Sequence, residues 1–322
     1  MSQKRTITVS DVCQKWLEEV RSSVRSSSIL QYDLVVQNYI LPGVGNIPAV
    51  NLTSDDLRAF LDHLLRDPSY HGKPLSPSTV SQIRTILKMI LTFGEDQNLM
   101  PQIRLRYRIP SSSGRMGRCL PPEDARQIER ALSGCQDPRL YGILLCLDMG
   151  LRLGELCALR WEDFDFDNHL LNVRHTVKRE EVIAPDGAIR SRWVIGLPKS
   201  SSSNRQIPIP AHMEKDLRGM RGLAADSSCF FLNGRSDRFV QPRSYQRTFR
   251  EFLDREEISP INIHSLRHSF ATRCIHATDA RTVSELLGHA DPTVTMRLYV
   301  HTTMDTKRKA MDEMERNRIH DA

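Results

Sequence analysis

Apolar side chains recur with the spacing of an α-helix through the first hundred residues of the chain. Near the N-terminus they fall at the i, i+3, i+4 and i+7 positions that form one buried helix face: Val9, Val12, Cys13, Trp16, Leu17 and Val20. Three more helices are expected: one from about Ser28 that stops before Leu41, one capped by Thr53, and one that begins at Ser76 with proline at its first position. Four helices joined by short connections predict a compact bundle over residues 1–104.

After the bundle the pattern changes, first to a stretch of linker composition at residues 105–118 that is rich in serine, glycine and arginine. Helix signals return near Pro121, in the apolar run Arg139–Leu147 and, beyond Gly150, in the segment Leu151–Trp161. Strand patterns then appear at residues 170–177, 189–197 and 206–209.

Helix signals resume at Ser244 and persist to the end of the chain. We therefore predict a mostly α fold with a small antiparallel β-sheet, the α+β class, in two domains. The second domain is expected over residues 119–301, followed by a tail helix over residues 302–322. Within that domain, the segment Lys178–Ser191 contains the turn signal Pro185-Asp186-Gly187 and predicts a protruding hairpin, longer than a minimal one, whose role the sequence does not assign.

Composition excludes several classes of protein. The chain has no apolar stretch of membrane-helix length, and its N-terminal residues lack the apolar core of a signal peptide. Its seven cysteines are scattered, odd in number and never spaced as C-x-x-C. This usage favours free thiols in a reducing compartment over a disulfide framework or a zinc site. We expect a cytoplasmic protein with no membrane partner and no metal.

Basic residues are concentrated in the first part of the chain. Residues 1–118 carry fifteen Lys and Arg against ten Asp and Glu, a balance of +5, whereas residues 119–322 carry thirty against twenty-nine, a balance of +1. The span between Asp96 and Glu123 holds no acidic residue and five arginines: Arg104, Arg106, Arg108, Arg115 and Arg118. Such a stretch indicates a polyanion partner, although a solvated, flexible linker explains it equally well on the sequence alone.

Cleaving a phosphodiester without a metal ion requires three kinds of group. A nucleophile must reach phosphorus, the non-bridging oxygens must be neutralised as charge builds, and the leaving 5′-oxygen must receive a proton. Arginine suits the second task because its rigid fork contacts two oxygens at once, and lysine or histidine suits the third. The second domain holds candidates for each task in the order Arg152, Lys199, His264, Arg267, His289 and Tyr299. Taken singly, each of them also has an ordinary structural explanation.

Four motifs in the second domain resemble the signatures of the tyrosine recombinase (phage integrase) family, in the family's order. The first is Gly150-Leu-Arg-Leu-Gly-Glu-Leu-Cys-Ala-Leu-Arg-Trp161. The second is Leu197-Pro-Lys-Ser followed by Arg205-Gln-Ile-Pro-Ile, which is similar to the family's β-hairpin with a lysine in its turn. His264-Ser-Leu-Arg-His-Ser-Phe-Ala-Thr resembles the next signature, and Leu286-Leu-Gly-His289 with Tyr299 ten residues beyond resembles the last. The four-helix first domain is similar to the DNA-binding core-binding domain of the family.

The resemblance implies a catalytic domain in which Tyr299 attacks the scissile phosphate, forms a 3′-phosphotyrosine and frees a 5′-hydroxyl. Arg152 and Arg267 would bind the non-bridging oxygens, and Lys199 would protonate the leaving oxygen. Attack on the phosphotyrosine by a different 5′-hydroxyl would join new partners, so no cofactor is expected.

The same resemblance implies supporting roles for the other polar residues of these motifs. His264 and His289 would hydrogen-bond the phosphate, with His264 favoured as the proton acceptor. Glu155, one helical turn after Arg152, would orient that guanidinium or a neighbouring histidine. His268 follows Arg267 and is expected to be a packing residue.

The function implied is that of a site-specific DNA recombinase, an integrase of a mobile element or phage. It would act on double-stranded attachment or recombination sites as a homotetramer, with an accessory DNA-bending or directionality protein as a further candidate partner. Two alternatives stay open: a type IB topoisomerase-like nicking-closing enzyme that acts as a monomer, and a DNA-binding regulator with an inactive site. The complete set of six candidate residues argues against an inactive site.

Two features concern the ends of the chain. The first expected helix begins near residue 8, which leaves no room for the additional arm-binding domain of larger integrases. The chain is therefore expected to be either a compact member of the family or a trimmed part of a longer protein. Family members often donate the segment after the tyrosine to a neighbouring subunit, and residues 302–322 are expected to dock in the same way.

Overall fold

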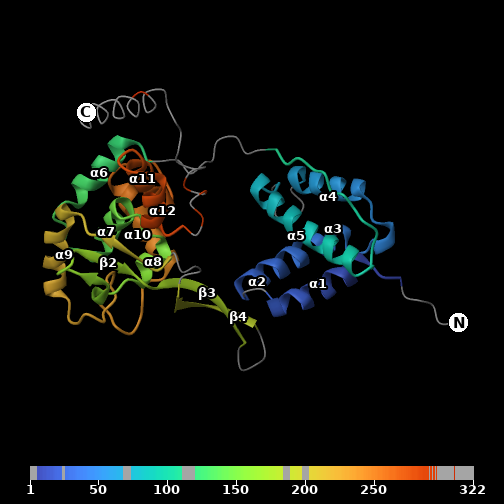
Figure 1. The fold of residues 1–322 in the computed structure, drawn as a ribbon, viewed down its shortest axis with the longest axis horizontal. Coiled ribbons are helices and arrows are strands. Elements are labelled where there is room, and N and C mark those ends of the chain that lie inside the picture. The colour runs from blue at the N-terminus through green and yellow to red at the C-terminus, as the bar shows by residue number, and fades with distance from the viewer. Residues whose placement is uncertain are drawn as a thin grey trace, which may run out of the picture. The chain divides into compact units, whose positions relative to one another are not determined.

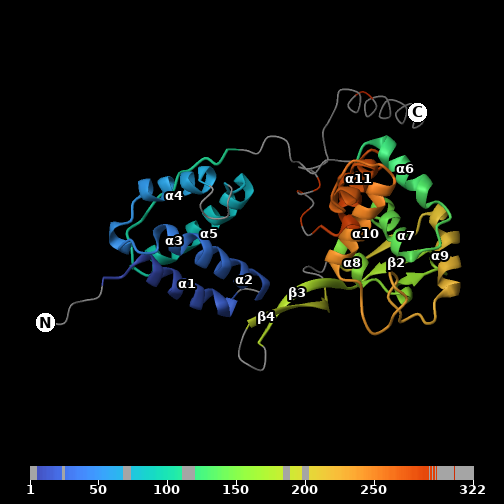
Figure 2. The same cartoon turned by 180° about the vertical axis from the view of Figure 1, so that it is seen from behind.

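The computed structural model describes residues 6–23, 26–67, 74–110, 120–183, 189–197 and 203–289, together with residues 291, 293, 295 and 308. Contacts divide the chain into two compact units, one of residues 1–115 with 179–192 and one of residues 116–178 with 193–322. The first unit is built mainly from helices, and the second combines helices with small antiparallel sheets (Figures 1 and 2). This architecture confirms the predicted fold class.

The first unit contains α1 (Val9–Ser23), α2 (Ser26–Val35), a π-helical turn (Val36–Ile40), α3 (Leu41–Val44), a 3₁₀ turn (Ala49–Asn51), α4 (Ser54–Arg66) and α5 (Pro77–Asp96). Side-chain caps fix the starts of two of these helices, as the sequence predicts. The Thr53 hydroxyl accepts the backbone N–H of Asp56 at 3.2 Å, and the Ser76 hydroxyl accepts that of Thr79 at 3.2 Å. The apolar helix faces enclose one core, with Leu61 among its fully buried residues.

The second helix departs from the prediction, because it does not stop before Leu41. Helix α2 passes through the π-helical turn directly into α3, and the N–H of Leu41 donates to the carbonyl of Val36. The wider turn places Pro42 in the first turn of α3, where no backbone N–H is required. Val36, Ile40 and Val44 then lie four residues apart and are all buried. Because a continuous helix buries all three, the chain stays helical through Pro42 and Gly43.

The helices of the second unit are α6 (Pro122–Leu132), α7 (Pro138–Asp148), α8 (Leu153–Ala158), α9 (Ala211–Leu223), α10 (Pro242–Arg255), α11 (His264–Ile275) and α12 (Ala280–Leu287), with a 3₁₀ turn at Trp161–Asp163. Its strands are β1 (Phe164–Asp165), β2 (Leu170–Val173) and β5 (Arg205–Pro208). The strands β3 (Thr176–Ile183) and β4 (Ile189–Gly196) are divided between the two units, because residues 179–192 are grouped with the first. Helix α9 covers a stretch for which the sequence pattern gave no prediction.

The strands form two separate antiparallel sheets. One has the order β1-β2-β5, with Leu171 opposite Ile207 in the β2–β5 pair, and the other is the β3–β4 ribbon. The single strand predicted at residues 170–177 is therefore wrong, because the chain leaves one sheet at Val173 and enters the other at Thr176. The ribbon agrees with the predicted hairpin, whose turn at Pro185-Asp186-Gly187 lies outside the described residues.

The helix predicted over Leu151–Trp161 is shorter in the structure. It ends at Ala158 because Leu159 is extended and its carbonyl accepts the N–H of Phe231 at 2.8 Å. The N–H of Trp161 in turn donates to the carbonyl of Cys229 at 3.1 Å. Backbone pairing with this distant segment replaces further helical hydrogen bonds, and only tertiary structure could show it.

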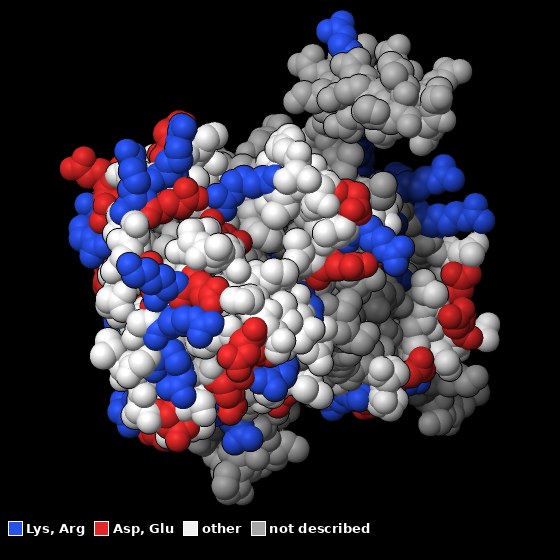
Figure 3. All heavy atoms as spheres, turned by 60° about the vertical axis from the view of Figure 1, so that its left-hand side comes forward, with Lys and Arg blue, Asp and Glu red and all other residues white. Residues whose placement is uncertain are grey.

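The core of the second unit is centred on α7, whose residues from Tyr141 to Leu147 are all buried. Helices α6, α8, α10 and α11 pack around it. Within the described part of the chain, no helix has the length and apolar character needed to cross a membrane. On the face of this unit that Figure 3 shows, basic and acidic side chains are interleaved. This agrees with the nearly balanced charge of residues 119–322.

Candidate active site

A left-handed turn at Gly150 places Arg152 at the start of α8. Gly150 has a φ of +66°, which favours glycine, and a Cβ added there would lie 2.5 Å from a ring carbon of Phe270. The chain then enters α8, and the backbone N–H of Arg152 donates to Oε2 of Glu155 at 2.9 Å. Glu155 therefore occupies one of the N–H groups that a helix start leaves without an intrahelical partner.

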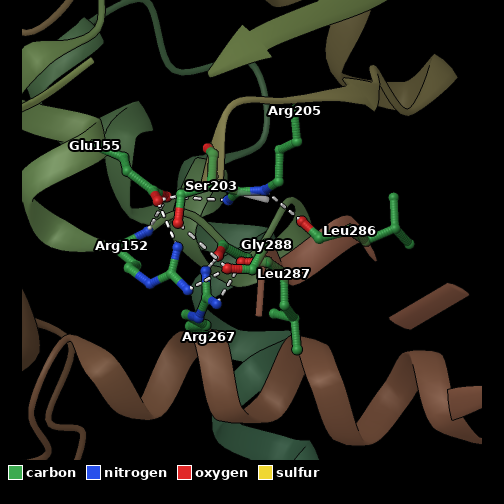
Figure 4. Close-up of polar contacts among 9 residues, drawn as sticks. Arg152, Glu155, Ser203, Arg205, Arg267, Leu286, Leu287 and Gly288 are labelled. Atoms are coloured by element: carbon green, nitrogen blue, oxygen red, sulfur yellow. Dashed lines mark hydrogen bonds and ion pairs between the residues drawn. The ribbon is translucent and has the colours of Figure 1, made fainter. Parts of the chain in front are cut away.

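The carboxylate of Glu155 is held between two guanidinium groups (Figure 4). Arg152 donates from Nη1 to Oε1 at 2.7 Å, and Arg205 donates from Nη1 to Oε1 at 3.1 Å and from Nη2 to Oε2 at 3.0 Å. The side chain of Glu155 is 2% exposed and that of Arg205 5%, whereas that of Arg152 is 33% exposed. Burial opposes ionisation of Glu155, but the charges and hydrogen bonds of Arg205 and Arg152 lower its pKa below the ordinary value.

Three arginines, Arg152, Arg205 and Arg267, converge on the C-terminal end of α12, and we call them the arginine cluster (Figure 4). Arg205 donates from Nε to the carbonyl of Leu286 at 2.6 Å, Arg267 from Nη2 to that of Leu287 at 2.6 Å, and Arg152 from Nη2 to that of Gly288 at 2.8 Å. The last carbonyls of a helix lack intrahelical partners and carry partial negative charge. The helix end thus fixes all three cations.

Arg267 connects this helix end to the Gly150 turn. It extends from the second turn of α11, its residue is 2% exposed, and it donates from Nη1 to the carbonyl of Gly150 at 2.7 Å. A cation buried to this degree is stable only when it is paired or hydrogen-bonded. The two carbonyl contacts of Arg267 therefore hold α11, α12 and the start of α8 together.

Two histidines flank Arg267 on α11: His264 is the first residue of the helix, and His268 lies one turn later. The rings of His264 and His268 are 4.6 Å apart between centroids and meet edge to face. Burial, together with the charges of His268, Arg267 and Arg152, lowers the pKa of His264 to about 4. Burial and Arg267 likewise lower the pKa of His268. His264 is therefore neutral at pH 7 and able to accept a proton.

His289 follows the end of α12 directly. Its Nδ1 is 2.8 Å from the hydroxyl oxygen of Thr295, a buried residue. Burial, together with the charges of Arg267, Arg152 and Arg205, lowers the pKa of His289 to about 4. The shared electrostatic partners show that His289 and His264 lie around the same cluster of arginines.

Together these groups have the charge and the hydrogen-bonding capacity to bind a phosphate. The arginine cluster and Glu155 sum to a net charge of +2, and the two flanking imidazoles are neutral. Each terminal nitrogen of a guanidinium carries two N–H groups, so Arg152 can bind an oxygen of a ligand without giving up its contacts to Glu155 and Gly288. Neutral imidazoles add hydrogen-bond donors or acceptors without adding charge.

The structure brings together five of the residues predicted from sequence: Arg152, Glu155, His264, Arg267 and His289. Lys199 and Tyr299 lie outside the described residues, so their predicted roles stay predictions. His268 is half-buried, and its ring packs edge to face against that of His264.

Arg205 belongs to a strand motif in the sequence, and the resemblance of that motif gives Arg205 no role in the site. The feature of the sequence that could have identified Arg205 is its position on the strand. Along β5 the residues alternate, with Arg205 and Ile207 buried and Gln206 and Pro208 exposed. An arginine on the inward face of a strand predicts a buried acidic partner, and Glu155 is that partner.

A separate basic surface lies in the first unit, on the predicted linker. Residues 104–109 alternate, so that Arg104, Arg106 and Arg108 are exposed while Leu105 is buried and Tyr107 is partly buried in the core of this unit. Arg84 donates to the carbonyl of Tyr107 at 2.8 Å, and the Tyr107 hydroxyl donates to Asp62 at 2.6 Å.

A groove of about 710 Å³ runs between this segment and α5. Four basic side chains and two hydroxyls are among its lining groups: Arg84, Lys88, Arg106, Arg108, Ser78 and Ser81. Arg115 and Arg118, the other two arginines of the predicted basic stretch, lie outside the described residues.

Comparison with known proteins places these observations in a family. The sequence model of the Phage integrase family matches residues 119–306, and that of the Phage integrase N-terminal SAM-like domain matches residues 8–65. The chain is 24% identical over 339 residues to a Tyrosine recombinase XerC-like protein of Caldanaerobacter subterraneus subsp. tengcongensis, covering 96% of this chain and 83% of that protein. It is 27% identical over 210 residues to the transposase from transposon Tn916 of Enterococcus faecalis, covering 59% of this chain and 49% of that protein.

Two solved structures share the fold. The Tn1549 transposon integrase in complex with a circular intermediate DNA matches with a TM-score of 0.76 and 19% identity, covering 96% of this chain and 99% of that one. A lambda integrase tetramer bound to a Holliday junction matches with a TM-score of 0.65 and 15% identity, covering 90% of this chain and 80% of that one.

Proposed function

Because this chain belongs to the phage integrase family and is a site-specific DNA recombinase, we propose that Arg152 and Arg267 of its arginine cluster bind the scissile phosphate. One observation carries the proposal: Arg152 and Arg267, from signatures far apart in the sequence, converge on the carbonyls of Gly288 and Leu287. Guanidinium groups that are fixed before the substrate arrives stabilise developing charge without reorganising during the reaction.

The chemistry follows from these positions and from the residues that the sequence supplies. The Tyr299 hydroxyl oxygen bonds to phosphorus as the bond from phosphorus to the 5′-oxygen breaks, which leaves a 3′-phosphotyrosine and a 5′-hydroxyl. Lys199 donates the proton that the leaving oxygen needs. Arg152 and Arg267 neutralise the non-bridging oxygens through the transition state. The reverse reaction with another 5′-hydroxyl restores the tyrosine, so the energy of the broken bond is kept and no nucleotide is consumed.

The lowered pKa of His264 keeps its ring unprotonated but also makes the ring a weaker base than an ordinary histidine. A base must be unprotonated to accept the Tyr299 proton, and His264, with its pKa lowered to about 4, is neutral at the pH of a cell. His289 is held through Nδ1 by Thr295, which leaves its Nε2 for the phosphate. We assign His264 as the base and His289 as a hydrogen-bonding partner of the phosphate.

Double-stranded DNA is the proposed partner of the basic groove in the first unit. The exposed Arg106 and Arg108, with Arg84 and Lys88 on α5, present four cations around one groove. Phosphate contacts of this kind fix a protein on the duplex without reading its sequence. The alternation along residues 104–109 supports this function over a solvated linker, because Leu105 and Tyr107 hold the segment in place while the arginines stay exposed.

A homotetramer on two DNA sites is the proposed assembly, and an integrase of a mobile element is the proposed biological setting. The relative from transposon Tn916 and the tetrameric assembly of lambda integrase on a Holliday junction support these two points. Strand exchange between two duplexes requires four cleavages, and one tyrosine per subunit then calls for four subunits. An accessory protein that bends the DNA or sets the direction would be a further partner.

The experiment that tests this function is a recombination assay without ATP on two copies of the DNA that flanks the gene. We expect recombinant product. Relaxation of supercoiled DNA by a monomer, with no recombinant, would favour the topoisomerase-like alternative. Site binding without any covalent adduct would favour a DNA-binding regulator.

A further inference from the structure

Arg205 is the most buried basic side chain around the site that the proposed reaction does not use. It begins β5, and its side chain is 5% exposed. Such burial is costly for a cation, and the contacts that compensate for it reveal what the residue does. Three of these contacts are hydrogen bonds to groups that hold the arginine cluster: two go to the carboxylate of Glu155 and one to the carbonyl of Leu286.

The carboxylate of Glu155 is saturated by these contacts. Its Oε1 accepts from the Nη1 atoms of Arg152 and Arg205, and its Oε2 accepts from the backbone N–H of Arg152 and from Nη2 of Arg205. A carboxylate has about four lone-pair positions, so each is taken by a donor. The planar, two-point contact of Arg205 fixes the rotation of the carboxylate. The carboxylate in turn fixes Arg152.

The charge balance of the site also points to a role for Arg205. Glu155, Arg152 and Arg205 together carry +1, so the carboxylate is shared and Arg152 keeps part of its charge for a ligand. Without Arg205 the remaining pair is neutral, and Glu155 would draw the guanidinium of Arg152 toward itself. The mutual dependence also shows in Glu155, whose pKa is held low against the effect of burial by both arginines.

We propose that Arg205 is a positioning residue for DNA cleavage, which acts through Glu155 to orient Arg152 and to keep its charge available to the scissile phosphate. A further contact of Arg205 leads to the same end of α12 through Ser203. It donates from Nη1 to the carbonyl of Ser203 at 3.3 Å, and the Ser203 hydroxyl donates to the carbonyl of Gly288 at 3.4 Å.

The test is a double-mutant cycle on the rate of covalent cleavage of a nicked DNA site, and it rests on the proposed function. Arg152→Ala should slow cleavage about 100- to 1000-fold, as loss of one charge-stabilising donor does in other enzymes. Arg205→Ala should slow it about 10- to 100-fold, as loss of a group that orients a ligand does. The double variant should cleave no more slowly than Arg152→Ala, because Arg205 acts through Arg152.

A second substrate separates positioning from general damage to the fold. In a methylphosphonate site, a methyl group replaces one non-bridging oxygen of the scissile phosphate and removes the negative charge that Arg152 meets. On this substrate the cleavage rates of Arg205→Ala and Arg152→Ala should both come closer to the wild-type rate, and by similar factors. A merely structural role of Arg205 predicts an equal defect on both substrates. The affinity for the intact DNA site should not change.

Matched variants keep the test decisive. Arg174→Ala removes another ion pair to a buried carboxylate of the same unit, that of Asp163 at 2.9 Å, and should leave cleavage unchanged. If Arg205→Ala does not fold, Arg205→Lys keeps the charge but loses the two-point contact. It should slow cleavage about tenfold in the wild-type background and not at all with Arg152→Ala.

The outcomes distinguish the two proposals. If Arg152→Ala cleaves at the wild-type rate, the arginine cluster is not the phosphate site and the proposed function of the cluster fails. If Arg152→Ala is impaired while the Arg205 defect is absent, is multiplied in the double variant, or is equal on both substrates, only the positioning role of Arg205 is overturned.

Discussion

The buried guanidinium of Arg267 donates to the backbone carbonyl of Gly150 at 2.7 Å. This contact joins two motifs that lie 117 residues apart in the sequence. It depends on a left-handed backbone at Gly150, whose φ is +66°, and on the close approach of the Phe270 ring. The geometry of the arginine cluster therefore depends on a residue without a side chain.

Gly150→Ala should disturb both stability and cleavage. A left-handed non-glycine residue costs about 1–2 kcal/mol, and overpacking against Phe270 adds about 1–3 kcal/mol. Gly134→Ala is the matched control, because Gly134 has a φ of +72° but nothing lies within 4 Å of an added Cβ. Denaturant unfolding should show a larger loss of unfolding free energy for Gly150→Ala, and only that variant should cleave DNA more slowly. Equal losses in the two variants would show that the Phe270 contact has no effect.

The two histidines should titrate well below pH 6.5. Burial and the nearby arginines lower the pKa of His264 and His289 to about 4, so between pH 6.5 and 4 the folded state binds fewer protons than the unfolded state. The free energy of unfolding should therefore fall as the pH drops below 6.5 and stay level above it. The drop should be smaller in His264→Asn and His289→Gln. Imidazole NMR signals that titrate near 6.5 would contradict this account.

Inorganic vanadate or phosphate should shift the same titrations upward. An anion bound between Arg152 and Arg267 offsets the positive charge that opposes protonation of His264 and His289. The NMR titration of the wild type with and without the anion measures the shift, and Arg267→Ala should abolish it. A pKa unaffected by the anion would place anion binding elsewhere.

The three exposed arginines of residues 104–108, two of which line the basic groove, should contribute to binding of any DNA sequence. Replacing Arg104, Arg106 and Arg108 with glutamine removes charge but leaves Leu105 and Tyr107 packed. Each lost phosphate contact should lower the slope of log K against log salt by roughly 0.9. Replacement of the exposed Arg126 and Arg130 on α6 is the control and should change the slope less. An unchanged slope in the triple variant would restore the interpretation of a solvated linker.

The sequence predicted most of the helices because their signals are local. The caps at Thr53 and Ser76 and the apolar spacing of α1, α4 and α5 depend only on nearby residues. The continuation of α2 past Pro42, the early end of α8 at Ala158 and the partner of Arg205 depend on contacts with distant segments. The exposed side of residues 104–109 follows from an alternation that is visible in the sequence. The arginines of this segment and the serines just beyond it, at residues 111–113, have the composition of a linker, which is why the sequence predicts a linker there.

The site was predictable to the extent that it consists of motifs. Arg152, His264, Arg267 and His289 were selected from motif resemblance, and the structure gathers them at the end of α12. The motifs do not predict which groups hold the arginines in place. These groups are the backbone carbonyls of Leu286, Leu287 and Gly288, and a backbone carbonyl is present whatever the residue type.

Residues 302–322 are expected to connect subunits. They lie almost wholly outside the described residues, and the prediction rests on a narrow stripe of Met304, Met311 and Met314 among dense charge. Deleting residues 306–322 should leave binding to a half-site unchanged but reduce cooperative binding to a full site and abolish strand exchange. Gel-shift titrations on both sites measure this. Normal cooperativity and recombination in the truncated protein would show that the segment is only a surface helix.

The central claim is that Tyr299 becomes joined to DNA at a phosphate held by Arg152 and Arg267. The most direct measurement is mass spectrometry of the peptide that stays attached to a nicked DNA site after denaturation and proteolysis. The account predicts a phosphotyrosine at Tyr299, formed by the wild type and absent from Tyr299→Phe, which should still bind the site. A DNA adduct on any other residue, or one that persists in Tyr299→Phe, would contradict it.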